Sequence, residues 1–229
     1  MATTATHRAD QAAVEANSVA APPAPATKAK QADPGPIGLA AIGGSAFILS
    51  MFNADQIDRS ALPVLFGVAL AYGGVVLILA GMWELKIGNT FGATAFLTYG
   101  GFFLSFWALE QFYLKQIVTA PGGVQHVGPA IGLFIVPWAI FTTYLGVASL
   151  RTTAALACTF VVAVPTLWLL TAGYLGLHLE QHQLTNDTIK AAGWFGMITA
   201  AAAWYASAAG VINTTFGRKI LPNKSLRPS

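Results

Sequence analysis

Two short segments begin predicted helices with residues that suit the binding of an anion. The first is Asp33-Pro34-Gly35-Pro36-Ile37-Gly38, and the second is Gly88-Asn89-Thr90. Proline fits a first helical turn because it has no N–H to leave unsatisfied, and Asn89 can cap the helix that follows it. The N–H groups at such helix ends, with the positive end of the helix dipole, attract a carboxylate. We therefore expect Pro34, Pro36, Gly38, Asn89 and Thr90 to form an anion-attracting mouth. The alternative is that they are ordinary helix starts.

A polar stripe follows along the predicted helix after Asn89. Thr90, Thr94, Thr98, Gly101 and Ser105 are three or four residues apart, which places them on one helical face, with Tyr99 beside it. Hydroxyl groups on one face can line a pathway for a polar solute. In membranes such small and hydroxyl residues also mediate helix packing, and the pattern alone leaves both readings open.

The histidines favour an external mouth over a metal site. His178 and His182 are four residues apart, with Glu180 between them and His126 in another predicted loop. The spacing suits a metal in a helix, but a zinc-protease motif needs Glu directly after the first His, where Leu179 stands. The sequence contains no nucleotide loop, nucleophile elbow or kinase signature. We therefore expect loop histidines, no metal, no cofactor and no enzyme activity.

The elements that position these residues must lie in a membrane. Only 9% of the 229 residues are charged, 55% are hydrophobic, and the mean hydropathy is +0.60, whereas a soluble domain carries about 25% charged residues. The excess of basic residues is only three and forms no patch, so nucleic acid is not an expected partner. The single cysteine, Cys158, excludes an intrachain disulfide. The composition predicts an integral membrane protein whose partner is the lipid bilayer.

Long uncharged stretches predict six membrane-spanning α-helices. The stretches are 34–54, 60–83, 87–109, 127–150, 152–179 and 191–217, and each exceeds the roughly 20 residues that a helix needs to cross the hydrocarbon core. The expected fold class is therefore all-α. Residues 1–32, rich in Ala, Pro and Thr, predict a disordered tail. Residues 33–222 form the expected six-helix transport domain, and 223–229 a short C-terminal tail.

The basic residues predict the orientation. An even number of spans puts both termini on one side, which then holds nine of the twelve basic residues, and the opposite side holds Arg59, Lys115 and Lys190. The nine are Arg8, Lys28, Lys30, Lys86, Arg151, Arg218, Lys219, Lys224 and Arg227. By the positive-inside rule both termini are cytoplasmic, and we expect a multi-pass protein of the plasma membrane. Charged residues all fall outside the spans or at their rims, which predicts a neutral interior.

Several motifs together resemble the acetate uptake transporter family (the succinate–acetate permease, or GPR1/FUN34/YaaH, group) over about residues 33–222. That family begins its first helix with Asn-Pro-Ala-Pro-Leu-Gly-Leu, where this chain has Asp33-Pro34-Gly35-Pro36-Ile37-Gly38-Leu39. The other matches are Tyr72-Gly73-Gly74, Ala80-Gly81 with Glu84, the nine residues GNTFGATAF from Gly88 to Phe96, Tyr99-Gly100, Phe216-Gly217-Arg218 and Leu221-Pro222.

The resemblance implies a six-helix protomer in a ring-shaped homo-hexamer, with one pathway per protomer for acetate and related small monocarboxylates, and succinate in some members. It implies a constriction on helices 1, 3 and 5, which falls on Ile42, Tyr99 and a position near Ala163. Ile42 and Ala163 are smaller than the usual residues there, so we expect a wider passage that admits longer monocarboxylates. Asp33 replaces the family's Asn, and Leu77 replaces its common Gln.

The mechanism stays open between two alternatives. In a channel-like pathway, Ser45, Thr94, Thr98 and the helix N-termini bind the anion on either side of Tyr99. In a proton-coupled pathway, a proton enters at the external mouth near Glu110, Glu180 or His126, because a neutral acid crosses an apolar neck more easily than a carboxylate does. Two other functions remain as alternatives: a membrane sensor or scaffold for carboxylic acids, and a channel for ammonia or water.

Overall fold

The computed structural model describes residues 31–176 and 182–226, without the side chains of 182–185. Residues 1–30 of the predicted tail, His178, Glu180 and the His182 side chain lie outside the described residues. The described part contains six helical segments long and apolar enough to cross a membrane. The prediction of an all-α membrane fold with six spans is therefore confirmed.

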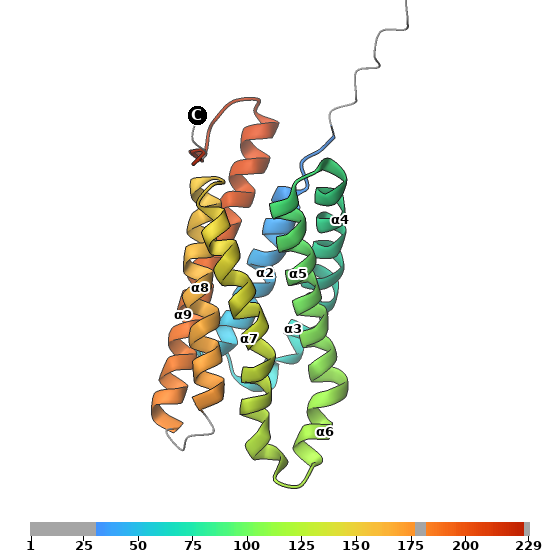
Figure 1. Ribbon diagram of the computed structural model, residues 1–229, viewed down its shortest axis with the longest axis vertical. Coiled ribbons are helices and arrows are strands. Elements are labelled where there is room, and N and C mark those ends of the chain that lie inside the picture. The colour runs from blue at the N-terminus through green and yellow to red at the C-terminus, as the bar shows by residue number, and fades with distance from the viewer. Residues whose placement is uncertain (1–30, 177–181, 227–229) are drawn as a thin grey trace, which may run out of the picture. The chain divides into compact units, whose positions relative to one another are not determined.

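The six spans are built from uninterrupted and composite helices (Figure 1). Helix α2 covers Gly35–Asn53. The second span starts with the 3-10 turn η1 (Arg59–Ala61) and α3 (Pro63–Val68), passes through the π-helical η2 (Ala69–Val76) and ends in α4 (Leu77–Ile87). The third joins α5 (Thr90–Ala108), the π-helical η3 (Leu109–Tyr113) and α6 (Leu114–Thr119). The others are α7 (Gly123–Ser149), α8 (Ala154–Gly176) and α9 (His182–Thr215).

The third span is longer than the uncharged stretch predicted. The stretch stopped at residue 109, whereas the helix continues past Glu110 and Lys115 to Thr119. Both charged side chains are partly or fully exposed, so the helix can extend beyond an apolar layer without burying them. Charge spacing marks where an apolar stretch ends, not where a helix ends.

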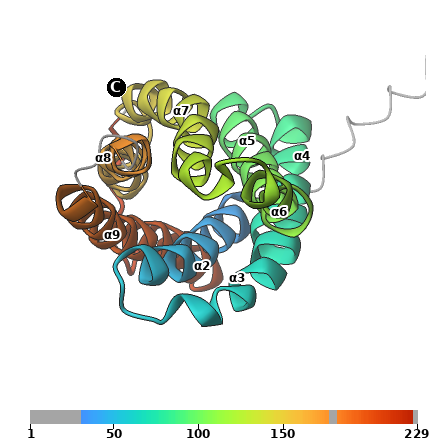
Figure 2. The ribbon, with the colours of Figure 1, turned by 90° about the horizontal axis from the view of Figure 1, so that it is seen from below.

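Viewed end-on, the helices of residues 33–226 form a closed ring (Figure 2). The order around it is α2, α9, α8, α7, α5 and then the η2–α4 segment, which returns to α2. Helices α2, α5 and α8 start at one end of this bundle, which we call the Asp33 end. The opposite end, where α2 finishes, is called the Asp55 end.

Glycines let neighbouring helices approach closely between α2, η2 and α5. A methyl group on Gly73 would lie 2.7 Å from the Phe103 ring and 2.7 Å from Ser45 Oγ. Such contacts are too short for any side chain larger than hydrogen, so the glycine sets the distance between these helices. This packing accounts for the burial of Ser45, whose side chain is 0% exposed.

The C-terminal segment is bonded to the bundle at the Asp33 end. Asn213 Oδ1 accepts hydrogen bonds from the backbone N–H groups of Ile220 (2.7 Å) and Leu221 (2.9 Å). Ala154 N–H donates to the carbonyl of Lys224 at 2.8 Å. Asn223 Oδ1 accepts from Ala155 N–H at 3.2 Å and so caps α8. Residues 223–226 were predicted to lie in a tail, but hydrogen bonds attach them to the folded body. Hydropathy could not predict this, because these bonds are polar contacts between distant segments.

Candidate transport cavity

A cavity of about 540 Å³ lies within the bundle. All six spans or their flanking segments contribute to its wall, and most of the wall is apolar. Ile42 on α2, Tyr99 on α5 and Ala163 on α8 all line it. The three residues of the predicted constriction thus come from three helices to one cavity, and that the cavity narrows at them stays a prediction.

Two aromatic rings lie close to Tyr99. Its ring centroid lies 5.4 Å from that of Phe141 and 6.3 Å from that of Phe160. Phe160 in turn meets Phe91 edge-on at 5.4 Å. Such pairs fix ring positions beyond what area burial provides. Sequence reasoning missed Phe160, which lies one helical turn before Ala163 and was hidden in a continuous apolar run.

The hydroxyl groups of the cavity wall differ from those predicted. Besides Thr152, Thr153 and Ser225 at the Asp33 end, the wall contains Ser50, Thr159, Thr166 and Thr199. Of these, Thr159, Thr166 and Thr199 each donate the hydroxyl proton to a backbone carbonyl one turn earlier, at 2.9–3.0 Å. A hydroxyl has one proton to donate and two lone pairs. These threonines therefore present acceptors to the cavity, which suit the O–H of a neutral acid better than a carboxylate.

The predicted polar stripe lies outside the cavity lining. Thr94 and Thr98 are partly exposed and absent from the wall, and a methyl group on Gly101 would meet nothing within 4 Å. Ser105 donates to the carbonyls of Gly101 and Phe102 in its own helix. Ser45 is also absent from the wall, since it packs against Gly73. The stripe thus does not line this cavity, and at Gly101 it does not pack against another described helix, so both readings stay predictions.

The Asp33 end of the cavity holds two of the predicted helix starts. Asp33 Oδ1 accepts a hydrogen bond from Gly35 N–H at 2.8 Å, and Asn89 Oδ1 accepts from Gly92 N–H at 3.2 Å. Both capping residues line the cavity, and so does Pro36. The chain's own oxygens thus satisfy N–H groups that were predicted to attract an anion.

The remaining residues of the predicted mouth lie beside the cavity. Pro34 and Gly38 are buried, and Gly38 packs on the Phe96 ring. Thr90 is exposed. None of these three is part of the described cavity wall. Their part in anion binding stays a prediction.

Glu84 corrects the prediction of a neutral interior. Its side chain is 1% exposed, lies within a membrane span and lines the cavity. The Asn89 side chain hydrogen-bonds it, while Oε2 has no hydrogen-bond partner among the residues that the structure describes. A methyl group on Gly92 would lie 2.6 Å from Glu84 Cδ, so the glycine leaves the space for this carboxyl group. The sequence showed Glu84 only as part of a motif, since its burial depends on packing.

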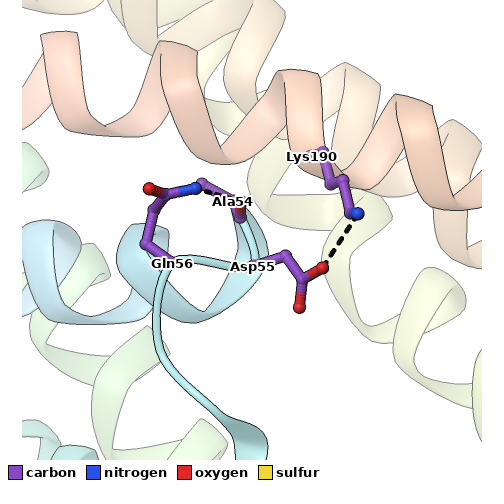
Figure 3. A network of polar contacts seen from close by, with 4 residues as sticks. All are labelled: Ala54, Asp55, Gln56 and Lys190. Carbon is purple, nitrogen blue, oxygen red and sulfur yellow. Dashed lines mark hydrogen bonds and ion pairs between the residues drawn. The ribbon is translucent and has the colours of Figure 1, made fainter.

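An ion pair joins α2 to α9 at the Asp55 end (Figure 3). Lys190 Nζ lies 2.8 Å from Asp55 Oδ2, and Gln56 Nε2 donates to the Ala54 carbonyl at 3.0 Å. The hydrogen bond from Lys190, followed by its charge, lowers the pKa of Asp55 below the ordinary value of 3.8. Beside the pair lies a second pocket of about 180 Å³, and Asn53 lines both this pocket and the main cavity.

Comparison with known proteins decides the family. The model of the GPR1/FUN34/yaaH family matches residues 16–226. This chain belongs to the GPR1/FUN34/yaaH family. Acetate permease A of Emericella nidulans is 37% identical over 197 residues, which cover 84% of this chain and 66% of that protein. The chain thus spans about two thirds of the length of this fungal family member.

Bacterial members of the GPR1/FUN34/yaaH family match over nearly their whole length. The succinate-acetate/proton symporter SatP of Escherichia coli is 32% identical over 193 residues, which cover 84% of this chain and 95% of that protein. A solved structure of the bacterial acetate channel SatP matches with a TM-score of 0.69 and 31% identity, covering 85% of this chain and all of that one. The chain is therefore a multi-pass membrane protein with the fold of this family.

Proposed function

We propose that this protein carries acetate and related small monocarboxylates across the membrane, each protomer through its own cavity. One observation carries the proposal: Ile42, Tyr99 and Ala163 come from three helices to one apolar cavity inside the six-span bundle. The names of the related permease, symporter and channel point to acetate, and one of them to succinate. These names describe transport, which supports a transporter rather than an enzyme.

The cavity wall supports a small weak acid as the substrate. A carboxylate buried without charge or donors is strongly disfavoured, and Thr159, Thr166 and Thr199 of the wall already donate their hydroxyl protons to backbone carbonyls. A neutral acid, by contrast, brings its own O–H. We therefore favour passage coupled to a proton over passage of a bare anion.

Assembly and orientation form a separate part of this proposal. The resemblance to the family supports a homo-hexamer, and the nine-to-three distribution of basic residues supports cytoplasmic termini and a place in the plasma membrane. In this orientation the Asp33 end is cytoplasmic. Mass measurement of the detergent-solubilised protein tests the hexamer, and a protease site inserted near a terminus tests the side.

Uptake of labelled acetate into proteoliposomes tests the proposed substrate. We expect protein-dependent uptake that unlabelled acetate and propionate compete for and methylammonium does not. Competition by methylammonium, with none by acetate, would support a neutral-solute channel instead. Comparison with labelled succinate, at equal concentration, sets the limit of substrate size.

A further inference from the structure

Glu84 lines the cavity as a buried carboxyl group, and one of its two oxygens lacks a hydrogen-bond partner among the described residues. The side chain is 1% exposed, and Oε2 has no hydrogen-bond partner in the described part of the chain. A buried ionised carboxylate is stable only when it is paired and fully hydrogen-bonded. An ionisable residue inside a membrane span that meets neither condition points to a function.

Among the residues that the structure describes, the groups around Glu84 do not include a cation that neutralises it. From the α2 side, Asp33 faces it: a methyl group on Gly35 would lie 3.0 Å from Asp33 Oδ1 and 3.6 Å from Glu84 Oε1. From α5, Asn89 and Gly92 face it, and neither is charged. Lys86, on α4 itself, has its Nζ 4.8 Å from the centre of the Trp83 ring. The charged group whose field reaches Glu84 is thus another carboxylate.

We propose that Glu84 is the proton-carrying group of the transport pathway, an inference that rests on the proposed function. In its neutral form, the Oε2–H group donates a hydrogen bond to the substrate carboxylate, which Thr159, Thr166 and Thr199 do not offer because their protons are bound to backbone carbonyls. In its ionised form, Glu84 and Asp33 together repel a substrate anion.

The charges balance over one cycle. One proton from water binds Oε2, one substrate carboxylate passes, and the proton leaves to water on the side where the substrate is released. One acetate anion and one proton therefore cross together, and no net charge moves. Passage through the wild-type protein follows a pH gradient and does not follow a membrane potential.

Glu110 is one of the residues near which the sequence analysis predicted that a proton enters. It lies in η3 of the third span, is partly exposed and is not part of the cavity wall. Its substitution by Gln therefore provides a matched control that removes a carboxyl group from the protein without changing the cavity. Of the other two proposed entry points, His126 is exposed and not part of the cavity wall, and Glu180 lies outside the described residues.

Flux measurements on purified protein in proteoliposomes distinguish a proton-carrying role of Glu84 from one of Glu110. Labelled acetate flux, after subtraction of the flux into empty liposomes, is measured under an imposed pH gradient and, separately, under a potassium diffusion potential set with valinomycin. We expect wild type, Glu110→Gln and Glu84→Asp to respond to the pH gradient alone. Glu84→Gln keeps a donor but cannot release a proton, so its flux should lose the response to pH and follow the potential.

Each other outcome decides the question. A Glu84→Gln flux that still follows the pH gradient as the wild type does overturns the proposal, and so does loss of that response in Glu110→Gln. If Glu84→Gln does not fold, judged by size-exclusion chromatography, Glu84→Asp must shift the pH profile of flux, and an unchanged profile overturns the proposal. Wild type that moves acetate only with the potential removes the proton role and leaves the proposed function intact. Wild type that moves no acetate removes both.

Discussion

The hydroxyl of Tyr99 lies 2.6 Å from Oγ1 of Thr142, and this hydrogen bond joins α5 to α7 beside the cavity. Thr142 donates its own proton to the Trp138 carbonyl at 2.7 Å. Since a threonine hydroxyl has one proton, Tyr99 is the donor in the bond between them. The bond holds the Tyr99 ring in the cavity wall, near Phe141 and Phe160.

Replacing Tyr99 by Phe should lower stability and keep the neck apolar. The change removes one hydrogen bond, whose net contribution is about 1 kcal/mol, while the ring stays in place. We expect a lower midpoint of thermal unfolding and retained acetate flux. Thr142→Val and the double variant complete a mutant cycle: if the two effects add fully, the two hydroxyls are not coupled, contrary to the structure.

Enlarging Ile42 should narrow the range of substrates. Ile42 is 8% exposed and lines the cavity opposite α5 and α8, so Ile42→Phe fills part of the passage. We expect uptake of butyrate and propionate to fall before uptake of acetate does. The control is Ile37→Phe on the same helix, since Ile37 is 52% exposed and outside the cavity wall. An unchanged substrate profile in Ile42→Phe would show that Ile42 does not limit the passage.

Adding a methyl group to Gly92 should displace Glu84. In Gly92→Ala the new Cβ would lie 2.6 Å from Glu84 Cδ, and overpacking of this kind costs about 1–3 kcal/mol. We expect a lower thermal midpoint and a weaker response of acetate flux to a pH gradient. The matched control is Gly67→Ala in α3, where a methyl group meets nothing within 4 Å. If Gly67→Ala lowered the thermal midpoint and the pH response of the flux as much as Gly92→Ala does, the contact between residue 92 and Glu84 would not be the cause.

Acid should weaken the link between α2 and α9. The pKa of Asp55 lies below its ordinary value of 3.8, mainly because Lys190 hydrogen-bonds its carboxylate. A lowered pKa stabilises the folded state above pH 3.8, and this stabilisation disappears as the pH falls through the lower value. The pKa of Asp58 is lowered too, by hydrogen bonds from Ser60, so part of the acid sensitivity belongs to that residue.

The variant Asp55→Asn separates the two contributions. Asparagine tolerates the positive φ of 58° at this position. The difference between the thermal midpoints at about pH 6 and about pH 3 should shrink in Asp55→Asn. The control is Gln56→Ala, which removes only the hydrogen bond to the Ala54 carbonyl and should leave this difference unchanged. A difference as large as that of the wild type would exclude a role of the ion pair. High salt should reduce the effect, since the pair is exposed.

The sequence predicted what depends on local composition. Uncharged stretches located six spans because a helix that crosses a bilayer must bury its backbone and carry apolar side chains. The resemblance implied that Ile42, Tyr99 and Ala163 lie on one pathway, and in the structure all three line one cavity. The first result follows from signals within each segment, and the second from the resemblance to a known family.

What the sequence did not predict depends on contacts between distant segments. The burial of Glu84 requires Gly92 and Asn89 from the next helix. Helical spacing placed Thr94 and Thr98 on one face but could not say which way that face points. The bonds that hold residues 223–226 run to the start of α8, about seventy residues earlier along the chain.

The most direct test of the central claim is chemical block of the cavity. In a Cys158→Ser background, which removes the single native cysteine, Ala163→Cys places a thiol in the cavity wall and Thr94→Cys places one outside it. Labelled acetate uptake into proteoliposomes is measured before and after a small methanethiosulfonate reagent is added. We predict that Ala163→Cys loses most of its uptake, that acetate slows this loss, and that Thr94→Cys keeps its uptake. Block at Thr94→Cys with none at Ala163→Cys would contradict a pathway through this cavity.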